Sequence, residues 1–255
     1  MVDSLFDTPR FNESLFFPRG DSHPGPPGSH DLWVAVSGAR LHLRHHPAPG
    51  AETFLLVFHG NGEVVSDYDE WAASLARRSP TSVLVCDYRG YGLSTGAPTL
   101  GLALDDAHAV LAAAVALRDQ RAPRAKLVVL GRSLGGHCAI ALCAEPSLSG
   151  LVLESAGYDL AALVARRGLP PETPFTEAER ARFDPAVKLL RARHPTLVVH
   201  GTRDTIIHYG EAEACAARLG PAATLAPVAG AGHNDLWSWP GYWQALTAFL
   251  QRIAG

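Results

Sequence analysis

The sequence predicts an α/β protein with a mostly parallel central sheet flanked by helices. Short apolar runs typical of buried strands alternate with segments typical of helices along most of the 255 residues. This alternation is the pattern of repeated strand–helix–strand units, whose strands run parallel. Glycine-rich loops with polar side chains directly follow several of the apolar runs. The length fits a single domain with a sizeable core.

The domain is expected to span residues 31–255, after an irregular N-terminal arm formed by residues 1–30. The arm is rich in Pro, Gly, Ser and His, and residues 23–28 read His-Pro-Gly-Pro-Pro-Gly. Directly after the arm, a Ser-Gly-Ala turn joins Trp33 to Val36 with Leu41 to His45, which predicts a hairpin.

The remaining elements alternate along the chain. Apolar runs predict strands over 54–58, 83–88, 126–130, 151–154, 196–200 and 223–228, and helices are predicted over about 67–78, 102–121 and 136–144. The last strand is expected at an edge of the sheet, because Pro227 has no N–H to donate to a neighbouring strand.

Residues 155–194 interrupt this alternation. Glycines, prolines and a charged run at 177–182 replace the expected short connection. Since a loop this long in a compact domain is usually functional, we expect a small cap of two or three short helices over the site. The alternative is a plain crossover with a long loop. Apolar residues of this segment either line an acyl pocket or pack between helices: Leu160, Leu163, Val164, Leu169 and Phe175.

The segment Gly-Arg-Ser-Leu-Gly at 131–135 carries the clearest chemical signal. It lies between the predicted strand at 126–130 and the small-residue helix that follows. A Gly-x-Ser-x-Gly in this setting is typical of a sharp turn that exposes a serine nucleophile, here Ser133. A chance match to so short a pattern is the alternative, but the strand and the helix on either side argue against it.

A serine hydroxyl needs a base, and the base needs an orienting acid. Asp204 follows the predicted strand at 196–200, and His233 lies in a glycine-rich loop after the strand at 223–228. Both therefore lie where the carboxyl ends of parallel strands gather their loops. Asp235 is the alternative partner for the histidine, but it is too close in sequence to reach the same ring nitrogen easily.

Two backbone N–H groups are expected to stabilise a negatively charged oxygen in the transition state. One belongs to Leu134, the residue after the serine. The other belongs to Asn61, in the His-Gly-Asn-Gly loop at 59–62 after the strand at 54–58. The Asn-Gly pair also predicts an ordinary turn, which is compatible with this role.

Five segments in order resemble the α/β-hydrolase superfamily. They are His-Gly-Asn-Gly at 59–62, the ten residues from Asp87 to Gly96, Gly-Arg-Ser-Leu-Gly-Gly at 131–136, His-Gly-Thr-Arg-Asp at 200–204 and Gly-Ala-Gly-His-Asn-Asp at 230–235. Within it they are similar to the Bem46-like serine hydrolases, a group that includes ABHD13-like and ABHD17-like proteins. The resemblance covers about residues 32–254. It implies an α/β-hydrolase fold in which Ser133 is the nucleophile, Asp204 the orienting acid and His233 the base.

Composition argues against several other classes of protein. The net charge of −3 gives no electrostatic case for a nucleic-acid partner. The apolar stretches are expected to be too short for a membrane span, and no signal-peptide pattern is expected at the N-terminus. The ABHD17-like enzymes carry an N-terminal cysteine cluster for lipid anchoring, whereas no cysteine precedes Cys86 here, so no stable membrane anchor is expected. Widely spaced cysteines predict buried thiols in a cytoplasmic protein.

No cofactor or metal is expected. His42, His45 and His46 cluster in sequence, but no Cys, Asp or Glu lies among them. The predicted function is therefore hydrolysis of a small-molecule ester or thioester through an acyl-enzyme. The alternatives are a peptidase or amidase of the same fold and a non-catalytic binding protein. The complete set of three reactive residues disfavours the non-catalytic binding protein.

Overall fold

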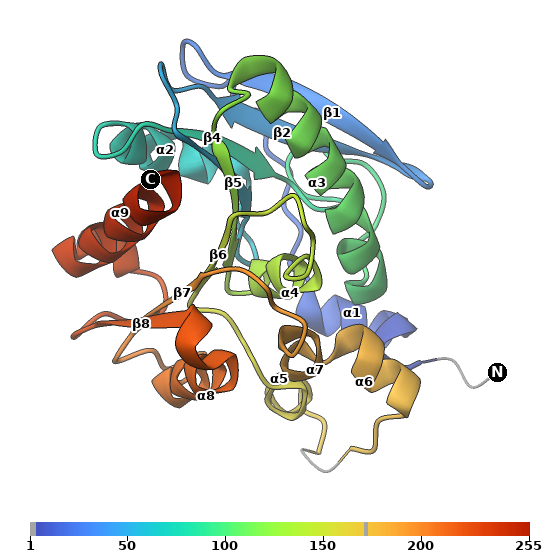
Figure 1. Ribbon diagram of the computed structural model, residues 1–255. Helices are drawn as coiled ribbons and strands as arrows, with labels where there is room; N and C mark the ends of the chain where they lie inside the picture. The colour runs from blue at the N-terminus through green and yellow to red at the C-terminus, as the bar shows by residue number, and fades with distance from the viewer. Residues whose placement is uncertain (1–3, 171–172) are drawn as a thin grey trace.

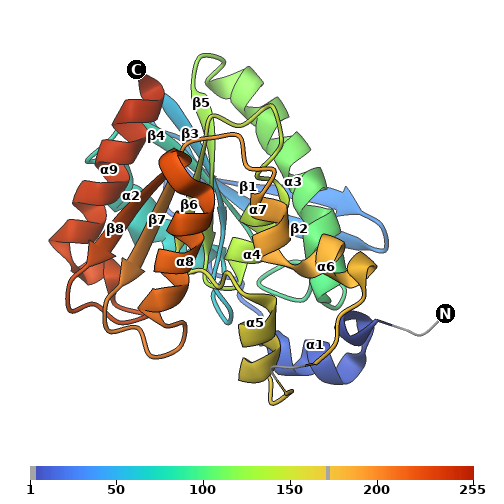
Figure 2. The ribbon, with the colours of Figure 1, turned by 60° about the horizontal axis from the view of Figure 1, so that its bottom comes forward.

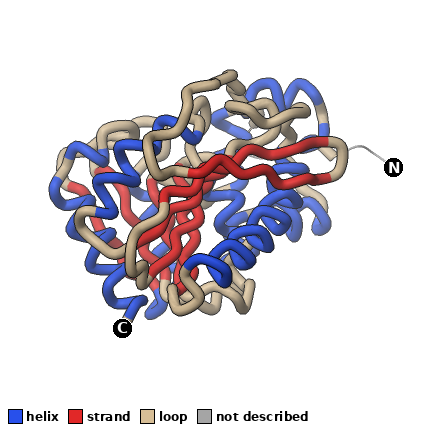
Figure 3. The backbone as a smooth tube through the Cα atoms, turned by 90° about the horizontal axis from the view of Figure 1, so that it is seen from above, coloured by secondary structure: helices blue, strands red, loops and turns tan. Residues whose placement is uncertain are grey.

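A single twisted sheet organises the computed structural model, which describes residues 4–170 and 173–255 (Figures 1 and 3). Within this part, eight strands lie in the order β1-β2-β4-β3-β5-β6-β7-β8. β1 pairs antiparallel with β2, and β2 pairs antiparallel with β4, whereas the other pairings are parallel. The strands are β1 (His30–Val36), β2 (Ala39–His46), β3 (Thr53–Phe58), β4 (Thr81–Cys86), β5 (Lys126–Arg132), β6 (Gly150–Glu154), β7 (Thr196–Gly201) and β8 (Ala223–Val228).

Helices cover both faces of the sheet, as predicted. One face packs against α3 (Leu100–Arg121), α4 (Gly135–Ala141) and α8 (Tyr209–Leu219), and the other against α2 (Asp69–Ala76) and α9 (Pro240–Ala254). The central strands β3, β4 and β5 are apolar on both faces because both faces are covered, which is why their sequences do not alternate in polarity. The α/β-hydrolase fold predicted from the sequence is confirmed, with β8 at an edge.

The N-terminal arm is irregular only in its second half, residues 16–29, so the predicted irregular arm is corrected for residues 5–15. Residues Leu5–Asp7 form a 3-10 turn and Pro9–Leu15 form α1. The Thr8 side chain accepts the N–H of Phe11, and Pro9 occupies the first turn, so the local sequence begins a helix. Apolar arm residues are buried, which fixes the helix on the body: Phe6, Phe11, Leu15 and Phe16.

The segment 155–194 contains three short helices, α5 (Leu160–Arg166), α6 (Glu177–Phe183) and α7 (Pro185–Leu189). Residues 171 and 172 within it lie outside the described residues. Figure 2 places α5 and α6 beside α1, at the end of the molecule where β3 and β5 end. Phe6 packs against Phe183 with ring centroids 4.4 Å apart, so the arm and this segment cover that end together.

One helix contradicts the expectation that no apolar stretch is long enough to span a membrane. By length and composition alone, α3 is such a stretch. Its buried residues, which include Leu104, Val110 and Leu111, pack against the sheet. In this structure α3 is therefore a helix of the protein core.

Candidate active site

Ser133 lies at the turn between β5 and α4, in a left-handed backbone conformation with φ of +49°. A side chain on Gly131 would meet the carbonyl oxygen of Gly135 at 2.4 Å, and one on Gly135 would meet that of Phe58 at 2.1 Å. Only glycine allows this close packing of strand, turn and helix. The N–H of Ser133 donates to the carbonyl of Glu154 at 2.8 Å, which ties the strained turn to β6.

The structure brings Ser133, His233 and Asp204 together. Nε2 of His233 lies 3.0 Å from Oγ of Ser133, and Nδ1 lies 2.7 Å from Oδ2 of Asp204. The competing carboxylate, Asp235, instead accepts the N–H of Gly232. This arrangement can transfer the hydroxyl proton to the imidazole while the carboxylate fixes the ring.

Hydrogen bonds keep Asp204 ionised. Its Oδ1 accepts the N–H groups of Ile206 and Ile207, each at 2.9 Å, and Nε2 of His200 lies 3.1 Å from its Oδ2. Burial acts to raise the pKa of Asp204, but hydrogen bonds from His200 and His233 outweigh it and hold that pKa far below its ordinary value. His200 was not singled out from the sequence.

The two N–H groups predicted to hold an oxyanion, those of Asn61 and Leu134, donate to no group among the described residues. The loop that carries Asn61 is fixed through its side chain. The Asn61 amide donates to the carbonyl of Leu15 at 2.6 Å, and its oxygen accepts the N–H of Phe17 and the hydroxyl of Tyr91. The arm therefore helps to position this loop.

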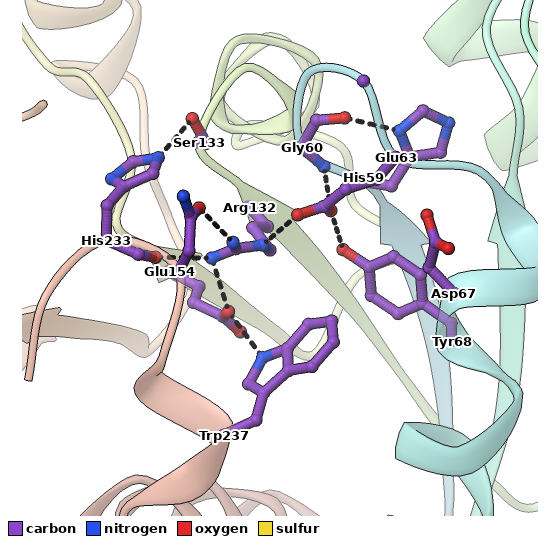
Figure 4. Close-up of polar contacts among 12 residues, drawn as sticks. His59, Gly60, Glu63, Asp67, Tyr68, Arg132, Ser133, Glu154, His233 and Trp237 are labelled. Atoms are coloured by element: carbon purple, nitrogen blue, oxygen red, sulfur yellow. Dashed lines mark hydrogen bonds and ion pairs between the residues drawn. The ribbon is translucent and has the colours of Figure 1, made fainter. Parts of the chain in front are cut away.

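Arg132, the residue before the serine, occupies the centre of a buried polar network that the sequence analysis missed (Figure 4). Its guanidinium donates to Glu63 at 2.7 Å and to Glu154 at 3.3 Å. It also donates to the backbone carbonyl of His233 and to the side chain of Asn234, each at 3.1 Å. Arg132 thereby ties the serine-bearing strand to the histidine-bearing loop.

Glu63 extends this network to the loop of Asn61. Its Oε2 accepts the N–H of Gly60 at 2.7 Å and the hydroxyl of Tyr68 at 2.8 Å. Burial acts to raise the pKa of Glu63, but the charge of Arg132 outweighs it and lowers that pKa. One guanidinium thus connects the serine turn to the loops that carry Asn61 and His233.

Glu154 closes the network on the side of α9. It accepts the indole N–H of Trp237 at 2.8 Å and the hydroxyl of Tyr242 at 2.7 Å. Its side chain is only 1% exposed, and burial raises its pKa in spite of Arg132. The sequence did contain a signal for this network. Arg132 and Glu154 each end an otherwise apolar run, and a charge at the end of a buried strand needs a buried partner.

A small pocket of about 50 Å³, open to solvent, lies over Ser133. Its walls come from the arm, the Asn61 loop, α4, α5 and the loop after Asp204. Of the five apolar residues considered for an acyl pocket, Leu163 lines it. The ring of Phe175 instead packs against Phe6 of the arm, with ring centroids 5.8 Å apart.

Within residues 4–170 and 173–255, no cluster of His, Cys, Asp and Glu has the arrangement of a metal site. The histidines considered for such a site lie on β2. His42 pairs with the buried Asp87 at 2.9 Å, and burial lowers the pKa of both His45 and His46 to about 4. A hydrogen bond therefore holds His42, whereas Nε2 of His45 and of His46 is buried without a hydrogen-bond partner among the described residues.

The sheet order, the strained serine between strand and helix, and loops gathered at the carboxyl ends of β3, β5, β7 and β8 define an α/β hydrolase. The sequence profile of the family described as "Serine aminopeptidase, S33" (Hydrolase_4) matches residues 50–192, more than half of the chain. The chain belongs to this family.

Relatives support the same classification. The chain is 30% identical over 210 residues to alpha/beta hydrolase domain-containing protein aho-3 of Caenorhabditis elegans, covering 82% of this chain and 60% of the relative. It is 29% identical over 206 residues to alpha/beta hydrolase domain-containing protein 17B of Homo sapiens, covering 80% and 68%. The chain thus spans less than two thirds of the worm relative.

Among solved structures, the esterase Pf2001 of Pyrococcus furiosus superimposes with a TM-score of 0.74 at 20% identity, covering 93% of this chain and 99% of the esterase. The thermophilic esterase Est2 of Thermogutta terrifontis gives a TM-score of 0.67 at 18% identity, covering 89% and 92%. At these identities the likeness shows the fold.

Proposed function

We propose that this hydrolase cleaves carboxylic esters or thioesters through an acyl-enzyme on Ser133. The observation that carries the proposal is the continuous contact from Ser133 Oγ through the His233 ring to Asp204, at 3.0 Å and 2.7 Å. A hydroxyl placed in this way loses its proton to Nε2 as it attacks a carbonyl carbon.

In the proposed reaction, the carbonyl oxygen becomes an oxyanion held by the free N–H groups of Asn61 and Leu134. Protonated His233 then gives its proton to the leaving alcohol or thiol, and the acyl group remains on Ser133. A water molecule, deprotonated by His233, attacks the acyl carbonyl, and the proton returned by His233 restores the serine hydroxyl.

The family description favours a second candidate, an aminopeptidase. Such an enzyme must bind the free ammonium group of its substrate, and a carboxylate is the usual partner for a buried ammonium. The described residues that line the pocket include Arg166 and Arg167 but no Asp or Glu. Esters and thioesters are therefore the preferred substrates in this proposal.

A panel of substrates tests the proposal. Wild type and Ser133→Ala are assayed on p-nitrophenyl esters of two to eight carbons, on the matching thioesters and on aminoacyl p-nitroanilides. We expect Ser133-dependent turnover of the esters or thioesters. Turnover of the anilides alone, or equal turnover by Ser133→Ala, would contradict the proposal.

A further inference from the structure

Two adjacent arginines at the end of α5 face the pocket over Ser133, and they are compensated differently. Arg166 forms an ion pair with Glu211. Arg167 donates from Nη1 to the carbonyl of Ser14 in the arm, at 2.7 Å. Among residues 4–170 and 173–255, no carboxylate oxygen lies within ion-pair distance of the Arg167 guanidinium.

One edge of the Arg167 guanidinium lacks acceptors. Nε is buried and has no hydrogen-bond partner, and Nη2 donates to no group in the described part of the chain. The Nε and Nη2 edge is the one that pairs with both oxygens of a carboxylate or phosphate. Because the bond to Ser14 holds the opposite side of the group, this edge is fixed in direction.

The described surroundings of Arg167 supply no compensating negative charge. Burial, followed by the charge of Arg166, lowers the pKa of Arg167, which shows that its charge is poorly compensated. His137 lines the same pocket, and burial, followed by the charges of Lys188 and Arg166, lowers its pKa to about 4. The neutral imidazole and the apolar side chains of Leu163 and Ile206 complete the walls.

A half-buried cation without a counterion is still costly, and a substrate anion would offset this cost. We propose that Arg167 binds an anionic group of the substrate, a carboxylate or a phosphate, so that the enzyme prefers esters or thioesters carrying such a group. This inference rests on the proposed function, because the scissile carbonyl must lie at Ser133. The anion belongs either to the acyl group or to the leaving group.

The experiment uses two pairs of chromogenic esters. Mono-p-nitrophenyl adipate and p-nitrophenyl hexanoate differ in a terminal carboxylate on the acyl chain. The compounds 3-carboxy-4-nitrophenyl hexanoate and p-nitrophenyl hexanoate differ in a carboxylate on the leaving group. The readout is the ratio of kcat/KM for the anionic ester to that for its neutral counterpart, measured for wild type, Arg167→Gln, Arg167→Lys and the control Arg124→Gln, whose side chain is exposed.

We expect the ratio in wild type to exceed one for at least one pair, and to fall about 10- to 100-fold in Arg167→Gln, as for the loss of a charged hydrogen bond. Arg167→Lys should give an intermediate ratio, and Arg124→Gln the wild-type ratio. Should Arg167→Gln fail to fold, the ratios of wild type and of Arg167→Lys still test the inference.

Three results separate the inference from the function on which it rests. Wild-type ratios below one for both pairs would overturn the inference, as would a ratio that Arg167→Gln leaves unchanged. In both cases, Ser133-dependent turnover of p-nitrophenyl hexanoate would leave the proposed function standing. Failure to hydrolyse any of these esters and any of the thioesters of the substrate panel would overturn both.

Discussion

Replacing Arg132 by glutamine should destabilise the protein and slow its reaction. The substitution leaves the carboxylates of Glu63 and Glu154 without their cation, and the guanidinium that they share is only 5% exposed. Breaking a buried ion pair from one side costs about 3–5 kcal/mol. Because the Glu63 side chain is 21% exposed, we expect about 3 kcal/mol at pH 7.

The pH dependence of this loss has a definite sign. Burial already raises the pKa of Glu154, and removing Arg132 raises it further. The folded variant then binds a proton that the unfolded chain, with an ordinary glutamate, has released. Stability of the variant therefore falls as pH rises above about 4.3, and the deficit relative to wild type is larger at pH 7.5 than at pH 5.5.

Urea denaturation at the two pH values measures the loss, and the triple variant Glu63→Gln, Arg132→Met, Glu154→Gln is the matched control. Since a neutral set of similar volume leaves no unpaired charge, we expect it to recover much of the stability. The kcat of both variants should be about 10- to 100-fold below that of wild type, because the backbone carbonyl of His233 loses its hydrogen-bond donor. A loss below about 1 kcal/mol together with an unchanged kcat in Arg132→Gln would refute this reasoning.

Three further predictions concern other parts of the molecule. Asp204→Asn should lower kcat by about 10³–10⁴-fold, because the amide favours the wrong tautomer of His233; equal rates would assign the orienting role elsewhere. The free energy of unfolding should fall by about 2 kcal/mol per buried histidine between pH 7 and pH 5. His45, with its pKa lowered to about 4, stays neutral in the folded chain, whereas the unfolded chain takes up the proton. In urea titrations His45→Gln should reduce the slope of stability against pH, and an unchanged slope would contradict this prediction. Leu163→Ala should shift ester preference towards longer acyl chains, with a change in transition-state binding of about 1–3 kcal/mol per methylene. Phe175→Ala should reduce stability and leave the chain-length preference unchanged. The reverse pattern would place Phe175 at the pocket.

Much of the sheet could be predicted because buried parallel strands leave a plain signal. The runs before Asn61, Ser133 and Asp204 are apolar throughout, since helices cover both of their faces. The loops that follow parallel strands gather at one end of the sheet, so the order of motifs was enough to bring Ser133, Asp204 and His233 to one place.

The arm was missed because its prolines and glycines outweighed a local helix signal. Thr8 followed by Pro9 is typical of a helix N-terminus, with Thr8 as the N-cap. So short a helix is stable only because Phe6 and Phe11 are buried. The helix α9 was not assigned either, although Tyr242, Leu246 and Phe249 recur at helical spacing and are buried in the structure.

The network around Arg132 could not be assembled from sequence. Its members, Glu63, Arg132 and Glu154, are separated by 69 and 22 residues, and nothing in their local patterns pairs them. Only the register of β5 beside β6, with Arg132 opposite Glu154, brings the charges together. The same holds for Arg167, whose partner in the arm lies 153 residues away.

The central claim is that Ser133 is the nucleophile, and covalent labelling tests it most directly. Wild type and Ser133→Ala are treated with a fluorophosphonate, and the adduct is located by intact-mass and peptide mass spectrometry. We predict one adduct per chain, on Ser133, with loss of ester hydrolysis in proportion to labelling and no adduct in Ser133→Ala. An adduct on another residue, or full hydrolysis by the labelled enzyme, would contradict the account.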